Sequence, residues 1–239
     1  MERRHATGMP PAWLSIGSGL LLVPVLWITL WTFGQTVAAA TVRGEFWSSP
    51  PVWWFHVGLL LWTITFAGLR GPALSWLYVF AHEWTHVIFT ILCGGRILAW
   101  PEVTSRGGHV LASKTNHLIS LSPYVFPFYS VLVAGVFFGL GALVDLGTAG
   151  EWIFYAALGY TWGFHVIFTA CMLWEAQSDL ARNGRFFSLV WIVLVNVLVL
   201  AALVLLASPG IEPWAFVAQW WRNVLSVRNW AEDTLSLAS

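Results

Sequence analysis

The stretch Ala81-His82-Glu83-Trp84-Thr85-His86 guides the interpretation of the whole chain, because it places three ionisable side chains inside an apolar segment, about residues 73–93. On a helix, His82 and His86 are four residues apart and project from one face, where both imidazoles can hold one metal ion. Glu83 follows the first histidine, where it can accept a proton from a metal-activated water. Ionisable groups within a spanning helix are costly, so the pattern indicates a functional site.

The His-Glu-x-x-His pattern is rare enough to be informative. A chain of this composition contains it by chance about 0.007 times. The alternatives are two histidines satisfied by neighbouring helices, or two axial ligands of a haem. Haem ligands normally come from opposite sides of the ring, so two histidines on one helix face suit a haem badly. A metal site is therefore the favoured interpretation.

The composition predicts an integral, multi-pass membrane protein surrounded by a lipid bilayer. Of 239 residues, 58% are hydrophobic and only 9% are charged, which is far from the composition of soluble domains. The formal net charge is zero and no basic patch is visible, so no nucleic-acid partner is expected. The chain contains eighteen tryptophans, a residue that is enriched where membrane helices meet the lipid–water interface. Cys93 and Cys171 both lie in apolar segments and imply no disulfide framework.

The predicted fold class is an all-α polytopic membrane protein with about six transmembrane helices. The expected spans are residues 13–40, 52–69, 73–93, 118–144, 152–175 and 186–207. The first span ends in a run resembling a signal-peptidase site. Its apolar core is longer than the roughly 7–15 residues of a signal peptide, so we expect a retained helix. Pro123 and Pro127 should kink or unwind the fourth span.

A short membrane-associated β-hairpin is predicted directly after the histidine helix. Residues 96–100 and 109–113 are β-like runs separated by a glycine-containing turn. Arginine and lysine counts in the connectors favour a cytosolic position for this hairpin, although the basic N-terminus argues for the reverse. The chain divides into N-terminal transmembrane helices, a membrane core and an amphipathic tail that should lie on the membrane. These three parts are residues 1–72, 73–207 and 208–239.

A hydrolytic zinc site needs three protein ligands and an open position for water, so a third ligand must come from elsewhere. The candidates are His165 and Asp179, fourteen residues and about 21 Å apart on a straight helix. If this span leaves the membrane near Glu175, His165 lies about 15 Å inside it, at a depth similar to the histidine pair. Asp179 lies beyond that boundary and reaches the pair only if the chain turns back. Depth therefore favours His165.

The same residues resemble the site-2 protease family of intramembrane zinc metalloproteases. The resemblance rests on His82–His86, followed by Cys93-Gly94-Gly95-Arg96-Ile97 and a β-like hairpin, and it covers about residues 73–190. It implies that a hairpin strand pairs with substrate and that a bound Zn²⁺ has three ligands and a neighbouring general base. The implied ligands are His82, His86 and Asp179, and the implied base is Glu83.

One departure from the family concerns the third ligand. The aspartate of the family usually sits in a stretch with asparagine or proline that ends Leu-Asp-Gly and unwinds the helix near the metal. Here the context is Gln177-Ser178-Asp179-Leu180, without a proline and without a following glycine. Family position favours Asp179 and geometry favours His165, so both stay candidates, with His165 first.

The expected function is a zinc metalloendopeptidase that cuts a transmembrane or membrane-proximal segment of another membrane protein, in a prokaryotic cytoplasmic membrane. The hairpin would capture an extended substrate by strand addition. Rival interpretations are a zinc amidase or lipid hydrolase, and a haem-binding or transport protein. Substrate identity and oligomeric state stay open. The candidate substrate-contacting residues are Arg96, Ile97, Leu98, Val110, Asn116 and Pro123.

Overall fold

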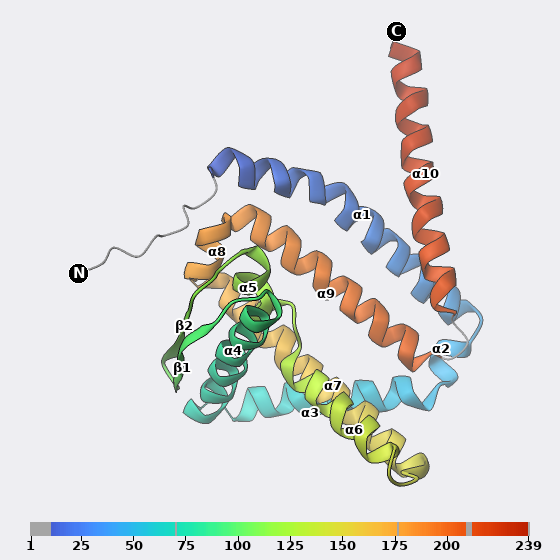
Figure 1. The fold of residues 1–239 in the computed structure, drawn as a ribbon. Helices are drawn as coiled ribbons and strands as arrows, with labels where there is room; N and C mark the ends of the chain where they lie inside the picture. The colour runs from blue at the N-terminus through green and yellow to red at the C-terminus, as the bar shows by residue number, and fades with distance from the viewer. Residues whose placement is uncertain (1–10, 70, 176, 209–211, 239) are drawn as a thin grey trace.

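The computed structural model describes residues 11–69, 71–175, 177–208 and 212–238. It is mostly helical, at 81%, with one small antiparallel sheet. The helices are α1 Ala12–Val42, α2 Glu45–Ser48, α3 Pro50–Gly68, α4 Pro72–Leu92, α5 His117–Leu121, α6 Phe128–Gly141, α7 Gly147–Trp174, α8 Ser178–Asn183, α9 Arg185–Ala207 and α10 Pro213–Ala238 (Figure 1). A 3₁₀ turn covers Ser122–Tyr124, and the strands are β1 Ile97–Thr104 and β2 Gly107–Ala112.

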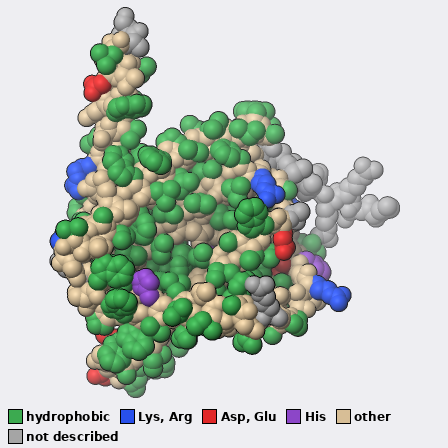
Figure 2. Space-filling view, turned by 180° about the vertical axis from the view of Figure 1, so that it is seen from behind, with side chains coloured by type: hydrophobic (Ala, Val, Ile, Leu, Met, Phe, Trp, Pro, Cys, Tyr) green, Lys and Arg blue, Asp and Glu red, His purple; other side chains and the backbone are tan. Residues whose placement is uncertain are grey.

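Four of these helices, α1, α3, α7 and α9, are long and apolar enough to cross a membrane. A fifth span results if the bent pair of residues 117–124 and α6 counts as one. Hydrophobic side chains cover most of the face in Figure 2. The fold is compatible with the predicted all-α membrane protein, but the described residues do not reach the predicted six spans. The difference is α4, because Glu83 and its two histidines lower the average hydropathy of that helix.

Helices α3 and α7 pack with their backbones in contact. A Cβ on Gly58 would lie 1.9 Å from the carbonyl oxygen of Ala156, and a Cβ on Gly159 would lie 2.0 Å from that of Phe55. Small residues at an interface let membrane helices approach this closely. From this contact α7 continues, with its C-terminal end, toward the histidine helix α4.

Helix α4 begins at Pro72, which is tolerated in the first turn because its missing N–H has no helical partner there. It ends at Leu92, and Gly94 follows the capping residue Cys93 with a φ of 74°, the left-handed conformation that terminates many helices. The predicted hairpin then forms, with Ile97 opposite Ala112 in an antiparallel register. Both strands contact α4, so the hairpin lies beside the histidine helix (Figure 1).

The prolines break the following apolar segment, as the sequence predicted. Residues 117–124 and α6 are bent by 78° relative to one another. Pro123 lies in the 3₁₀ turn, and α6 starts immediately after Pro127. The bend turns the short helix α5 toward α4, so the carbonyl group of Ile119 faces the histidine helix.

A second break separates α7 from α8. The end of α7 at Trp174 matches the predicted end of a span near residue 175, but the new helix that starts at Ser178 was not predicted. Glu175 (φ −85°, ψ 162°) and Gln177 (φ −94°, ψ 131°) have extended backbones, although the sequence has no proline here. The chain turns back after α7, which is the condition under which Asp179 reaches the histidine pair.

Helix α10 is joined to α1 by buried side-chain hydrogen bonds. Asn223 donates to Thr32 Oγ1 at 2.9 Å and to Gln35 Oε1 at 2.8 Å. Trp220 Nε1 donates to Thr29 Oγ1 at 3.1 Å. Beyond this contact α10 extends away from the rest of the molecule (Figure 1). The predicted helix in the tail is present, and its place on a membrane surface stays a prediction.

Candidate metal centre

Helix α4 directs His82 and His86 toward one point. Their Nε2 atoms lie 3.2 Å apart, and their ring centroids lie 4.8 Å apart. Each side chain is only 11% exposed. The shared face predicted from the spacing of four residues is thus formed.

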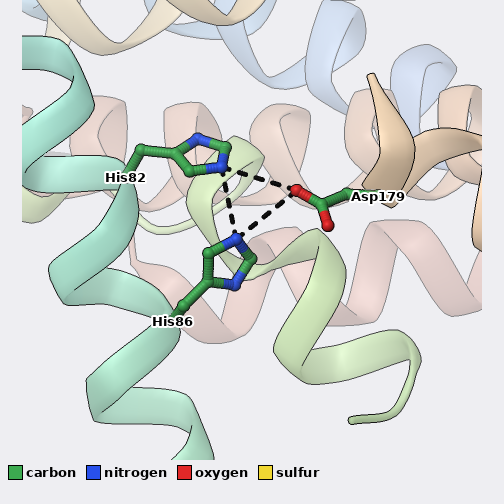
Figure 3. A group of neighbouring side chains, drawn as sticks. All are labelled: His82, His86 and Asp179. Atoms are coloured by element: carbon green, nitrogen blue, oxygen red, sulfur yellow. Dashed lines mark hydrogen bonds and ion pairs between the residues drawn. The ribbon is translucent and has the colours of Figure 1, made fainter. Parts of the chain in front are cut away.

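Asp179 on α8 completes the cluster. Its Oδ2 lies 3.5 Å from His82 Nε2 and 3.4 Å from His86 Nε2. Figure 3 shows the carboxylate pointing between the two rings, opposite α4. Each of the three residues offers one ligand atom, and together they could hold a metal ion.

His165, which depth favoured as the third ligand, is not part of this group. Its Nε2 lies 3.2 Å from Oδ1 of Asn196 on α9, and its ring packs against Trp162. It lines a small cavity of about 20 Å³ on another side of His82. The structure corrects the preference for His165: the break after α7 brings Asp179 back to the histidine pair instead.

Side-chain hydrogen bonds hold α8, and with it Asp179, in place. Asn183 is 2% exposed and donates from Nδ2 to the backbone oxygen of Asp179 at 2.7 Å. The same nitrogen donates to Oγ of Ser120 on α5 at 2.6 Å, and Asn183 Oδ1 lies 2.5 Å from Nδ1 of His117. These contacts join α8 to the segment that follows the hairpin and fix its position without a proline.

The Asp179 side chain lies outside the candidate membrane spans. Burial raises the pKa of its carboxyl group, but the hydrogen bonds from His82 and His86 act in the opposite direction and outweigh it. The net result is a pKa below the ordinary value of an aspartate. This direction favours the deprotonated form that metal binding requires.

The outward-facing nitrogens of the two rings also have partners. His86 Nδ1 lies 2.9 Å from the backbone oxygen of Ile119. A carbonyl oxygen can only accept, so Nδ1 carries a hydrogen, and in the neutral ring Nε2 then presents its lone pair to the cluster. His82 Nδ1 lies 3.2 Å from the hydroxyl oxygen of Tyr78, one helical turn earlier.

A cavity of about 520 Å³ opens over the cluster. Its lining combines the three cluster residues and Glu83 with hairpin residues 105–110 and with residues at the break after α7. Glu83 is 6% exposed. Gly108 packs onto it so closely that a Cβ at this glycine would lie 2.8 Å from Glu83 Cγ. The absence of a side chain at Gly108 thus lets the hairpin tip cover the carboxylate.

The fold separates the predicted substrate-contacting residues. Val110 lines the cavity over the cluster, whereas Pro123 lines the smaller cavity beside His82. Asn116 caps α5, where its Oδ1 accepts a backbone N–H at 2.8 Å. Three others are absent from the described lining of the large cavity: Arg96, Ile97 and Leu98.

Three residues with clear roles in the site were not singled out from the sequence. Tyr78 could have been found, because it precedes His82 by the same four residues that separate the two histidines. Gly108 gave a weaker signal as part of a glycine pair in the hairpin turn. Asn183 gave none, since its hydrogen bonds depend on the unpredicted break.

No family model, curated protein or solved structure matches the chain.

Proposed function

We propose that this chain is an integral membrane zinc metalloendopeptidase of the site-2 protease type, which hydrolyses a peptide bond in a transmembrane or membrane-proximal segment of another protein. The observation that carries the proposal is the convergence of His82, His86 and Asp179 in a cavity that also contains Glu83. Two imidazoles and one carboxylate form a known ligand set of hydrolytic zinc sites, which keep one position open for water.

The distances within the cluster support zinc. Ligand atoms bound tetrahedrally at ~2.0–2.1 Å from zinc are about 3.3 Å apart from one another. The three ligand atoms here are separated by 3.2, 3.4 and 3.5 Å. His86 presents a lone pair, and Asp179 presents a negative charge to the same space. In the state with both Nε2 lone pairs facing the carboxylate, a cation placed among the three atoms would stabilise the group.

The chemistry requires a base, and Glu83 is placed to act as one. When bound, a zinc ion would supply Lewis-acid polarisation of a peptide carbonyl and of the attacking water. Glu83 would accept the proton of that water as its oxygen bonds to the carbonyl carbon. The same carboxyl group would return the proton to the leaving nitrogen when the C–N bond breaks. The low exposure of Glu83 keeps bulk water from competing for this proton.

The hairpin favours a peptide over an amide metabolite or a lipid as the substrate. Strand β2 and its turn run along the cavity, with Gly107, Gly108 and Val110 in the lining. A strand beside the reacting centre can hold an extended peptide by main-chain hydrogen bonds. The four to five apolar helices around the site support a substrate that shares the membrane, and we infer a multi-pass protein of a prokaryotic cytoplasmic membrane.

The decisive experiment replaces Glu83 by glutamine, which keeps the side-chain shape but removes the base. Cells producing the wild type or Glu83→Gln would be compared by mass spectrometry of new peptide N-termini in membrane proteins. Wild type should generate termini within or beside apolar segments, and Glu83→Gln should generate at least 100-fold fewer, on the order of the loss of a general base. The variant should still bind about one zinc per chain.

The matched control is Glu175→Gln, a second carboxylate that lines the same cavity. It is not assigned to proton transfer and should keep cleavage within a few-fold of wild type. Identical sets of termini from wild type and Glu83→Gln would show that the proposed hydrolysis is wrong.

A further inference from the structure

Tyr78 lies one turn before His82 on α4 and is fixed at both ends of its side chain. Its ring stacks on Phe168 of α7, with centroids 4.9 Å apart and planes inclined by 12°. Its hydroxyl oxygen lies 3.2 Å from His82 Nδ1, and the residue is 8% exposed. The hydroxyl group is therefore held against the side of the imidazole that faces away from Asp179.

The positions of the hydrogens follow from the ligand geometry. His82 can offer the lone pair of Nε2 to a metal only in the neutral tautomer that carries its hydrogen on Nδ1. A tyrosine hydroxyl oxygen can accept a hydrogen bond as well as donate one. In the metal-binding state Tyr78 must therefore accept from Nδ1. The backbone oxygen of Ile119 accepts a hydrogen bond from Nδ1 of His86 in the same way.

We propose that Tyr78 is a positioning residue of the metal centre, whose hydroxyl group keeps His82 in the tautomer and orientation that direct Nε2 toward His86 and Asp179. The inference rests on the proposed zinc function and adds to it a residue outside the ligand set. A carbonyl partner cannot be removed by substitution, whereas the hydroxyl of Tyr78 can. His82 is therefore the ligand whose outer contact is open to a direct test.

The test compares zinc affinity in Tyr78→Phe and the wild type, using the purified full-length chain and competition with a zinc chelator. Phenylalanine keeps the ring that stacks on Phe168 and removes only the acceptor. Loss of such an outer partner lowers metal affinity about 10–100-fold. Cobalt substituted for zinc provides a second readout: its visible absorption bands should shift in Tyr78→Phe, because His82 becomes a weaker and less fixed ligand.

Tyr129→Phe is the matched control. The Tyr129 hydroxyl donates to the backbone oxygen of Leu77 at 2.8 Å, so this change also removes a hydroxyl contact to α4 but leaves His82 untouched. It should alter neither zinc affinity nor the cobalt bands. Tyr78→Gln, which offers an oxygen acceptor four residues before His82, should regain part of the affinity lost in Tyr78→Phe.

The outcomes separate this inference from the proposed function. Wild-type affinity in Tyr78→Phe would overturn the positioning role and leave the zinc enzyme intact. An equal loss in Tyr129→Phe, or no recovery in Tyr78→Gln, would assign the effect to packing of α4 and would also overturn the role. Absence of zinc binding in the wild type would overturn both proposals.

Discussion

At the scale of single residues, the arrangement around Asp179 explains why a carboxylate is stable in an apolar molecule. A buried carboxylate without partners is strongly disfavoured. Here two imidazole nitrogens lie within 3.5 Å of one carboxylate oxygen, and Asn183 binds the backbone oxygen of the same residue. The imidazoles match the charge when they donate from Nε2, and a bound cation would take their place when Nε2 presents its lone pair.

Asp179→Asn should therefore lose most of the zinc bound by the wild type, because an amide is a much poorer ligand than a carboxylate. His165→Ala should keep most of it, because His165 is hydrogen-bonded to Asn196 and stands outside the cluster. Metal analysis of the two purified variants gives the zinc bound per chain and shows which variant retains more. Greater retention in Asp179→Asn than in His165→Ala would contradict the ligand set.

The residues of the site differ in how far the sequence could predict them. His82, Glu83 and His86 follow from a local rule, since a helix places positions four apart on one face whatever its surroundings. The position of Asp179 depends on how the chain runs between α7 and α8, where the sequence has no proline or glycine. The depth argument favoured His165 because it took the chain to leave the membrane there without turning back. Hydrogen bonds across 60 and more residues, which no local pattern contains, stabilise the break.

At the scale of elements, α8, which carries Asp179, is a helix of six residues, too short to be stable alone. Its position comes from tertiary contacts, among them the hydrogen bonds of the buried Asn183. Asn183→Ala should lower zinc affinity about tenfold although it touches no ligand atom, since outer partners of metal sites typically contribute 10–100-fold. Chelator competition on the purified protein measures this loss.

Asn223→Ala is the control for that experiment. Asn223 is equally buried, at 3% exposure, and its hydrogen bonds join α10 to α1. Loss of either asparagine should cost about 1–3 kcal/mol of stability, because buried groups lose their partners. Only Asn183→Ala should weaken zinc binding. An equal loss of affinity in both variants would show that α8 is not specifically positioned by Asn183.

The elements that the sequence predicted correctly are those whose turn or break is marked by glycine or proline. The glycine-containing turn predicted the hairpin, and the two prolines predicted the 78° bend. The expected six spans are not confirmed, because α4 is absent from the helices that are apolar enough to cross a membrane and its polar face belongs to the cavity. The division of the chain near residues 72 and 207 stays a prediction.

At the scale of the whole molecule, α3 and α7 pack with their backbones in contact, and α7 continues to Phe168, which stacks on Tyr78 beside His82. A leucine at Gly58 would meet the backbone of α7, which cannot move aside as a flexible side chain can. Gly58→Leu should destabilise the protein by about 1–3 kcal/mol or more, the usual cost of overpacking. Thermal unfolding in detergent measures the change.

Gly68→Ala is the control, because a Cβ at Gly68 meets nothing within 4 Å. It lies at the end of the same helix and should leave the unfolding temperature unchanged or slightly higher. Equal unfolding temperatures for Gly58→Leu and the wild type would show that α3 and α7 are not in backbone contact.

The contact between α1 and α10 has a consequence for biosynthesis. Helix α1 leaves the ribosome before α10, because Asn223 follows Thr32 by 191 residues. During that interval the hydroxyl hydrogens of Thr29 and Thr32 are already bonded to carbonyl groups of their own helix, at 2.7 Å each. The oxygen lone pairs remain free and later accept from Trp220 and Asn223. Helix α1 can thus enter a lipid phase with its hydroxyl donors satisfied, and α10, which is translated later, then supplies the donors that join the two helices.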